Sequence, residues 1–308
     1  MSNHRNVSCG LELPPSDVLA PDKPLSTASA AALATATRIA RDDGAALHLL
    51  TALDFDFAAD WMLQDAKLKG GDSVVERARA RLVALAATAQ AAGLRVTIET
   101  STRSPADALL VDAAQEHRDL IVVGTRERGS IVRNLLGSTA LSLLRRATVP
   151  VWVARTAYGD KPPTVLAAID LGDMAPRVVA AAAHAAAAAG GTLHVLHVVD
   201  FSAEDVLRTG SADLEFVTEY RRRKREDAEV KVPEIVANAC ASGPKATIHL
   251  RYGDVRPTIL GVAEEVRADL VVIASVVHGA LGAAISGLGR TAEHVLPRLP
   301  TSLLVLKP

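Results

Sequence analysis

The chain repeats itself at a distance of about 150 residues, and this repeat limits the folds open to it more than any other feature. Residues 44–55 read GAALHLLTALDF and residues 190–201 read GGTLHVLHVVDF, identical at six of twelve positions with an offset of 146 residues. Three further pairs follow in the same order: residues 18–21 and 165–168, residues 119–125 and 269–275, and residues 137–140 and 289–292. This spacing indicates a duplicated domain, because solenoid units are only roughly 20 to 50 residues long.

The length of the chain agrees with a duplication, since 308 residues correspond to about two domains of ordinary size. We expect a flexible N-terminal tail over residues 1–15, a first domain over residues 16–156, a linker over residues 157–163 and a second domain over residues 164–308. The expected tail is polar and contains prolines, and the segment around the linker reads TAYGDKPP.

The composition excludes several classes of protein. The net charge is −1, so nothing in the overall charge favours nucleic acid or an anionic membrane. No apolar run reaches the roughly 18 residues of a membrane span, and the N-terminus does not resemble a signal peptide. Two cysteines do not form a disulfide framework, so we expect a protein of the reducing cytoplasm.

Apolar runs alternate with helical segments in both copies. In the second copy we expect strands near residues 165–169, 193–199, 246–251, 270–275 and 302–306, with helices near 175–189, 213–241, 255–267 and 290–298. In the first copy we expect strands near residues 17–21, 46–53, 95–101, 119–124 and 150–155. Alternation with continuously apolar strands predicts the α/β class: two tandem domains, each a five-stranded parallel sheet with helices on both faces.

The segment after the fourth strand of the first copy carries a candidate phosphate site. Ligands of such sheets bind at the carboxyl ends of the strands, and here a strand runs through a glycine-containing loop into a helix that opens with Gly-Ser-Thr. Backbone N–H groups and the positive end of a helix suit a phosphate. The candidate residues are Gly124, Arg126, Gly129, Gly137, Ser138 and Thr139. The alternative interpretation is structural: Gly124 permits a turn and Ser138 caps the helix.

Residues 119–155 read DLIVVGTRERGSIVRNLLGSTALSLLRRATVPVWVAR and resemble the C-terminal half of a universal stress protein domain. The end of the second copy, GRTAEHVLPRLPTSLLVLKP, is similar to the end of the tandem members of that family. The resemblance covers the chain from about residue 16 and implies the Rossmann-like fold of the universal stress protein A family. Some members bind ATP through a Gly-x2-Gly-x9-Gly-Ser/Thr pattern, and others lack both the pattern and the nucleotide.

Both copies depart from that pattern. In the first copy Glu127 occupies the second glycine position, where a carboxylate would repel a phosphate. Gly129, two residues on, offers partial compensation. In the second copy Ala274 and Val277 replace the two loop glycines and Arg290 stands in the place of Ser138. The phosphate end is therefore better preserved in the first copy.

The end of the site next to strand one is instead better preserved in the second copy. ATP-binding members of the family use an acidic residue just after strand one, and the second copy supplies Asp170 there. In the first copy we expect Asp22 in this role, one position early. The resemblance then implies an adenine pocket lined by Pro21, Asp22 and Leu53 in the first copy, and by Ala168, Asp170, Val198 and Gly253 in the second. For Asp170 a turn or strand-end residue is the structural alternative.

The remaining features favour structural interpretations. The basic run at residues 221–225 is followed by acidic residues, which is typical of the solvated face of a long helix rather than of a nucleic-acid site. His194 and His197 lie three apart on an expected strand and face opposite ways, so no metal site is predicted. No nucleophile–base motif or Walker loop is present. The last strand of each copy would be an apolar edge, so we expect the copies to pair through these strands.

Two functions are therefore weighed against each other. The first is a cytoplasmic stress-response protein that binds ATP, with or without magnesium, weakly in one domain. The second is a stress scaffold or sensor that works without nucleotide, through protein or other small-ligand contacts. An enzyme, at most a slow ATPase, ranks last, and whether two chains form a homodimer is left open.

Overall fold

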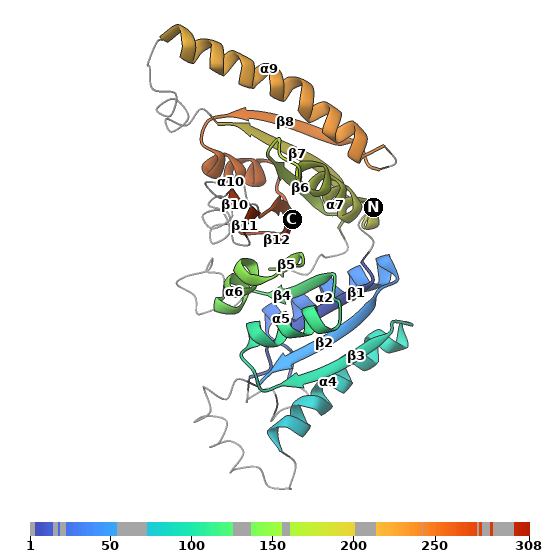
Figure 1. Cartoon of the computed structure of the whole chain (residues 1–308). Coiled ribbons are helices and arrows are strands. Elements are labelled where there is room, and N and C mark those ends of the chain that lie inside the picture. The colour runs from blue at the N-terminus through green and yellow to red at the C-terminus, as the bar shows by residue number, and fades with distance from the viewer. Residues whose placement is uncertain are drawn as a thin grey trace. The chain divides into compact units, whose positions relative to one another are not determined.

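The computed structural model of the chain describes residues 4–14, 18, 23–53, 73–125, 137–155, 161–200, 214–241, 243–275, 277–278, 284–285 and 299–308. The chain divides into two compact units, with main spans at residues 3–158 and residues 159–306 (Figure 1). We call them the first and the second unit.

The first unit is a parallel sheet with the strand order β3-β2-β1-β4-β5. Its strands are β1 (Asn6–Leu11), β2 (Ala46–Ala52), β3 (Val96–Ser101), β4 (Leu120–Gly124) and β5 (Val151–Ala154). Its helices are α2 (Thr27–Asp43), α4 (Val74–Ala91), α5 (Pro105–Gln115) and α6 (Ser138–Arg146).

The second unit repeats this arrangement, with the order β12-β9-β6-β7-β8. Its sheet strands are β6 (Thr164–Ile169), β7 (Thr192–Val199), β8 (Ala246–Tyr252), β9 (Leu270–Ala274) and β12 (Ser302–Leu306). Its helices in the described part of the chain are α7 (Ala175–Ala188), α9 (Leu214–Ala239) and α10 (Val255–Glu265). A short antiparallel pair, β10 (Val277–His278) and β11 (Ala284–Ile285), follows β9 in a segment expected to be a loop.

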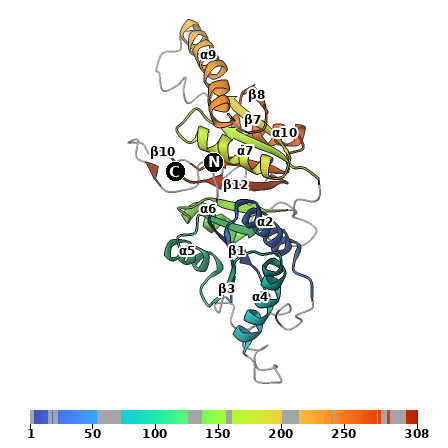
Figure 2. The same ribbon diagram turned by 90° about the vertical axis from the view of Figure 1, so that its right-hand side faces the viewer.

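Helices cover both faces of each sheet, as right-handed connections between parallel strands require. In the first unit α2 and α4 lie on one face and α5 and α6 on the other, which is plain when the sheet is seen edge-on (Figure 2). In the second unit α7 and α9 pack together over β6 to β8. The expected fold class, two tandem α/β domains with five-stranded parallel sheets, is confirmed.

The first strand is not where the sequence predicted it. β1 runs from Asn6 to Leu11 and pairs in parallel with β2 and β4, inside the segment expected to be a flexible tail. The expectation of a flexible tail is therefore wrong for residues 6–11, which form the strand beside β2 and β4, and the strand expected near residues 17–21 lies mostly outside the described residues. Strand pairing orders this segment, because its backbone N–H and C=O groups bond to both neighbours and Val7 and Cys9 are fully buried.

The repeated sequence motifs have structural causes. Gly44 and Gly190 each follow a helix and adopt positive φ, 68° and 63°, which an L side chain disfavours. Asp119 and Asp269 each accept hydrogen bonds from backbone N–H groups at the start of the first strand of their unit, for example from Thr164. The residues that the two copies share at these positions thus stabilise the fold of each unit.

The cores are aliphatic, as the 3% aromatic content requires. Alanine-rich faces of α2 and α7 are buried against the sheets, and Trp152 of β5 is 3% exposed. Among the described residues no helix is long and apolar enough to cross a membrane.

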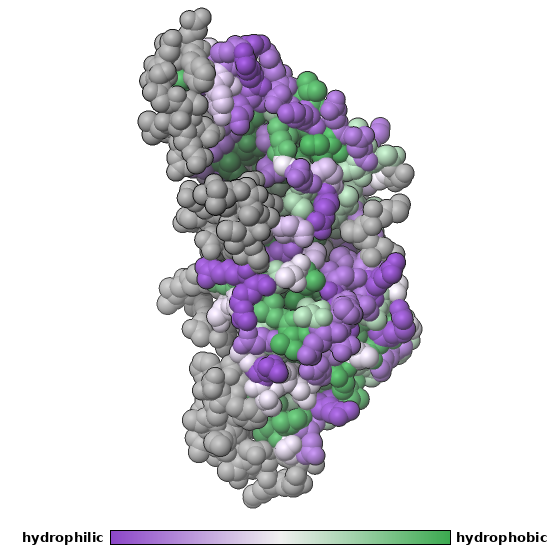
Figure 3. All heavy atoms as spheres, in the orientation of Figure 1, coloured by the Kyte–Doolittle hydropathy of each residue, from purple (hydrophilic) through white to green (hydrophobic). Residues whose placement is uncertain are grey.

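The basic run lies on α9, which continues through Pro233 without a break. Its side chains are exposed, and the surface over this helix is largely hydrophilic (Figure 3). Arg222 pairs with Glu219 at 2.8 Å and with Glu226 at 2.5 Å, and Lys231 pairs with Asp227 at 2.9 Å. These pairs one turn apart fit the interpretation of a solvated helix face.

Candidate functional site

Each sheet has one point where the strand order reverses. Strand β1 lies between β2 and β4, and β6 lies between β7 and β9, so the connections leave in opposite directions on either side. Parallel sheets bind ligands in the crevice at the carboxyl ends of such strand pairs. The end of β1 with the end of β4, and the end of β6 with the end of β9, are therefore the places to look.

Glu12, rather than Asp22, is the acidic residue that follows the first strand of the first unit. The register pairs Gly10 with Val123, and β1 ends at Leu11 and β4 at Gly124, so Glu12 follows β1 at the carboxyl edge that the two strands share. The backbone of Glu12 is fixed to α2, because its N–H donates to Ser29 Oγ and the Ser29 hydroxyl donates to the Glu12 carbonyl oxygen. The side chain of Glu12 is exposed. Sequence reasoning missed it because β1 had been placed too late in the chain.

Close packing against helix α2 requires a glycine at position 124. A Cβ atom at this position would lie 2.2 Å from the carbonyl oxygen of Ala28 and 2.6 Å from its carbonyl carbon. The first turn of α2 therefore approaches the end of β4 more closely than any side chain at residue 124 would permit. Helix packing is therefore a sufficient reason for glycine at this position.

The last glycine of the predicted site, Gly137, precedes helix α6. Gly137 is the N-cap residue, with φ −63° and ψ 154°, and no side chain bonds to the first turn. The expectation that Ser138 caps the helix is therefore wrong, since Ser138 is the first helical residue and is exposed. The N–H groups of the first turn have no partner within the helix, so they and the helix dipole favour an anion.

Several residues of the predicted site lie outside the described residues. These are Pro21, Asp22, Arg126 and Gly129, together with Glu127, which interrupts the family pattern. Leu53 is described: it follows β2, it is fully buried, and its N–H donates to the Ser101 carbonyl oxygen at 2.7 Å. Thr139 follows Ser138 in the first turn of α6 and is half-buried.

In the second unit the predicted residues surround the end of β6. Asp170 is exposed and its Oδ1 accepts a hydrogen bond from the Gly172 N–H at 3.0 Å, so it forms the local turn that the structural alternative expected. Ala168 lies in β6 and Val198 in the adjacent β7. Gly253 follows β8 with φ 127°, and its N–H donates to the Val199 carbonyl oxygen. The loop that would carry a phosphate lies largely outside the described residues, Arg290 included.

One pair of contacts repeated at this edge was not foreseen. Thr51 Oγ1 donates to the carbonyl oxygen of Leu11, and His197 Nδ1 bonds to the carbonyl oxygen of Ile169 at 3.0 Å. The strand registers make these positions equivalent, so a side chain of the second strand satisfies the last carbonyl of the first strand in both units. No pattern in the sequence indicates this pair of contacts, since one residue is a threonine and the other a histidine.

The second unit also contains a pair of imidazoles, His194 on β7 and His249 on β8. His194 Nδ1 and His249 Nε2 lie 2.9 Å apart and the rings are stacked. Burial lowers the pKa of both imidazoles below 6.5, neighbouring His194 adds to the effect at His249, and Glu265 opposes it. Both rings are therefore neutral at neutral pH, and one donates a hydrogen bond to the other.

We expect this pair to make the protein less stable in mild acid. Below pH 6.5 the unfolded chain takes up protons before the folded chain does, so the unfolded state gains. The loss begins as the pH falls through 6.5 and levels off below the folded-state pKa values. Urea midpoints measured from about pH 8 to about pH 5 check this. The His249→Gln variant should give a flatter profile, and a profile as steep as that of the wild type would contradict this role of the pair.

The parallel α/β domains and their switch-point edges define a fold class shared by many nucleotide-binding proteins, and the comparisons identify the family within it. The model of the universal stress protein family matches residues 17–155 and again residues 163–307. The chain therefore belongs to the universal stress protein family, as a tandem member with two such domains.

Individual relatives agree with this assignment. A universal stress protein of Mycolicibacterium smegmatis is 28% identical over 221 residues, which is 69% of this chain and 70% of the relative. Universal stress protein G of Salmonella typhimurium is 32% identical over 85 residues, 28% of this chain and 58% of the relative. Among solved structures, a universal stress protein from Archaeoglobus fulgidus superposes with a TM-score of 0.67 at 22% identity, covering 98% of each chain. At that identity the superposition shows a shared fold.

Proposed function

We propose that this protein is a cytoplasmic stress-response protein whose first unit binds an adenine nucleotide weakly. The observation that carries the proposal is the carboxyl edge of the first sheet, where the exposed Glu12 follows β1 and Gly124 ends the adjacent strand β4. ATP-binding members of the family have an acidic residue at the end of strand one, and here it belongs to the same unit as the Gly-Ser-Thr helix start. This placement supports a site with both ends in the first unit.

The roles of the residues follow from their chemistry. The N–H groups at the start of α6, with the hydroxyls of Ser138 and Thr139, would bind phosphate oxygens. Glu12 would accept hydrogen bonds from the adenosine moiety, and Gly124 lets the first turn of α2 approach the end of β4 beside the site. Magnesium would reach the site with the nucleotide, since it is usually held by phosphates and few protein groups.

We expect Ser138→Ala to weaken ATP binding by about tenfold, because a hydrogen bond to a charged phosphate is worth roughly 1.5–3 kcal/mol. Calorimetric titration of ATP, with and without magnesium, into nucleotide-stripped protein measures this. Ser142→Ala, one turn further along the same helix, is the matched control and should bind like the wild type. Equal affinity of the Ser138 variant and the wild type would contradict the assigned site.

The Glu127→Gly variant separates this proposal from its alternative. If the site is an ATP site weakened by one carboxylate, removing Glu127 raises the affinity. If ATP at millimolar concentration gives no heat with this variant or with the wild type, the nucleotide proposal fails.

A second function is favoured by Gly124 itself. Packing against Ala28 accounts for this glycine without any ligand, and Asp170 of the second unit forms a turn. A stress scaffold or sensor that acts without nucleotide is consistent with both observations. In that case the protein's own ligand should be sought among the small molecules that co-purify with it, and its partners among the co-purifying proteins. Pairing of the two units through β5 and β12, and a homodimer of the chain, stay predictions for solution measurements.

A further inference from the structure

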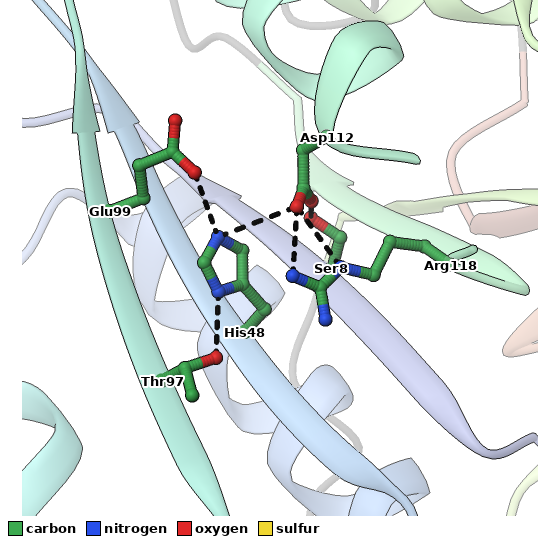
Figure 4. A network of polar contacts seen from close by, with 6 residues as sticks. All are labelled: Ser8, His48, Thr97, Glu99, Asp112 and Arg118. Carbon is green, nitrogen blue, oxygen red and sulfur yellow. Dashed lines mark hydrogen bonds and ion pairs between the residues drawn. The ribbon is translucent and has the colours of Figure 1, made fainter. Parts of the chain in front are cut away.

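A row of polar side chains crosses the first sheet beneath helix α5, away from the nucleotide edge. Ser8 of β1, His48 of β2 and Thr97 of β3 are direct register neighbours, so they point to the same face. Asp112 of α5 lies over this row, and Glu99, two residues after Thr97, lies on the same face (Figure 4). Five polar side chains thus meet in a layer that is otherwise aliphatic.

Most of this cluster is firmly held. The Asp112 carboxylate, 1% exposed, accepts a hydrogen bond from the Ser8 hydroxyl at 2.6 Å through Oδ2. Its Oδ1 accepts two N–H bonds from the Arg118 guanidinium at 3.0 and 2.9 Å. His48 Nδ1 bonds to the Thr97 hydroxyl at 2.8 Å. When that nitrogen carries the proton, the lone pair of the imidazole is left on Nε2.

His48 Nε2 is buried and has no hydrogen-bond partner. It faces Glu99 Oε2 and Asp112 Oδ1, each at 3.6 Å, which is too long for a hydrogen bond (Figure 4). The side chain of His48 is only 6% exposed, so water does not solvate this nitrogen freely. One unpartnered nitrogen and two carboxylate oxygens therefore converge, all within 4.8 Å of one another.

We propose that His48, Glu99 and Asp112 bind a divalent transition-metal ion, for which Zn²⁺ is the natural probe. Zinc takes imidazole nitrogen and carboxylate oxygen at about 2.0–2.2 Å, and tetrahedral bonds of that length separate their ligand atoms by about 3.3–3.6 Å. The two separations of 3.6 Å from His48 Nε2 lie at the upper end of this range, and all three ligand atoms lie within 4.8 Å of one another. The site lies away from the carboxyl edge of the sheet and does not depend on the nucleotide proposal.

Some neighbouring residues favour metal binding at this site, and one opposes it. Thr97 orients the imidazole and Ser8 orients the Asp112 carboxylate, as hydrogen-bonded outer residues of metal sites do. Glu99 is half-exposed, at 49%, so a water can occupy the fourth position. Arg118 uses both lone-pair directions of Asp112 Oδ1, so metal binding requires one of its two hydrogen bonds to give way. Burial lowers the pKa of His48, so a proton competes weakly with the metal at neutral pH.

The second unit provides an internal contrast. His194 is the register equivalent of His48, between Leu166 and Thr247. His249 stands in the place of Glu99, and Val262 of α10 stands in the place of Asp112. The second unit therefore lacks both carboxylates. The sequence did not suggest the site, because its three ligands come from three separate elements and no short spacing marks them.

The test is calorimetric titration of Zn²⁺ into the untagged, metal-stripped full chain, with thermal melting of the same samples. We expect one site per chain in the first unit and a rise in Tm of about 5 °C or more at a hundredfold excess over Kd. Glu99→Gln, at a half-exposed position, should weaken binding at least tenfold. Glu116→Gln removes one exposed carboxylate from the end of the same α5 region and should bind like the wild type.

Three results would overturn the proposal. One is a Glu99→Gln variant that binds Zn²⁺ as tightly as the wild type. Another is the absence of both heat and a Tm shift with Zn²⁺, Co²⁺ and Mn²⁺. The third is binding that is lost in His249→Gln but kept in Glu99→Gln, since that would assign the ion to the imidazole pair of the second unit.

Discussion

The Gly124→Ala variant is expected to lose about 3 kcal/mol or more of the free energy of unfolding of the first unit. The added Cβ would meet the carbonyl oxygen and carbon of Ala28 at 2.2 and 2.6 Å, distances that real Cβ atoms do not show. These are backbone atoms in the first turn of α2, so no side-chain rotation relieves the clash. Helix α2 packs on β1 and β4, and moving it away would open that core. Differential scanning calorimetry measures the loss.

Gly261→Ala is the matched control for this variant. Gly261 lies within α10, and a Cβ there would have no atom within 4 Å. Alanine is the better helix former by about 0.8–1.0 kcal/mol, so this variant should melt at the wild-type temperature or above it. A Gly124 variant that also melts like the wild type would show that α2 does not approach β4 as closely as described.

The second large effect is expected from Asp112→Ala, which should cost about 3–5 kcal/mol of unfolding free energy. The change leaves the Arg118 guanidinium, 10% exposed, without its carboxylate and leaves the buried Ser8 hydroxyl without its acceptor. Chemical denaturation at neutral pH measures the loss. Asp107→Ala, on the same helix, breaks the exposed pair with Arg146 and the hydrogen bond from the Ser104 hydroxyl, and it should lose far less because it leaves no buried charge unpaired.

The second unit indicates how this loss can be relieved. It holds Leu166, Val262 and Ala268 where the first unit holds Ser8, Asp112 and Arg118, and these three residues are buried. Removing both partners of a buried ion pair costs less than removing one. Asp112→Val combined with Arg118→Ala should therefore be more stable than Asp112→Ala alone. A double variant less stable than the single one would mean that the Arg118 stem packs independently of its charge.

The order of the helices and strands could be predicted because apolar strand segments alternate with helical segments along the sequence. Apolar runs such as β9 and helices such as α7 are continuous in the sequence, and their bounds agree with the expected ones to within one or two residues. The misplaced first strand has a physical reason. β1 reads NVSCGL, in which Ser8 serves the Asp112 network and Gly10 makes room for Leu109, whose Cδ1 would lie 2.7 Å from a Cβ.

The site was predictable in part for the same reason. Gly124 and Gly137 stand in one continuous segment and could be read from it, whereas Glu12 depended on knowing where β1 ends. The His48 cluster could not be read at all, since residues 48, 99 and 112 meet only through strand register and helix packing. Pairing across a sheet is not encoded in any local window of sequence.

The burial of Trp152 in β5, directly across from Val122 of β4, gives the protein a built-in optical reporter. The chain has two tryptophans, Trp61 and Trp152, and both precede residue 158, so intrinsic tryptophan emission comes from the first unit alone. Calorimetry records the heat of both units. A fluorescence melt overlaid on a calorimetric melt therefore separates the two transitions without any label, and each variant can be assigned to the unit that it disturbs.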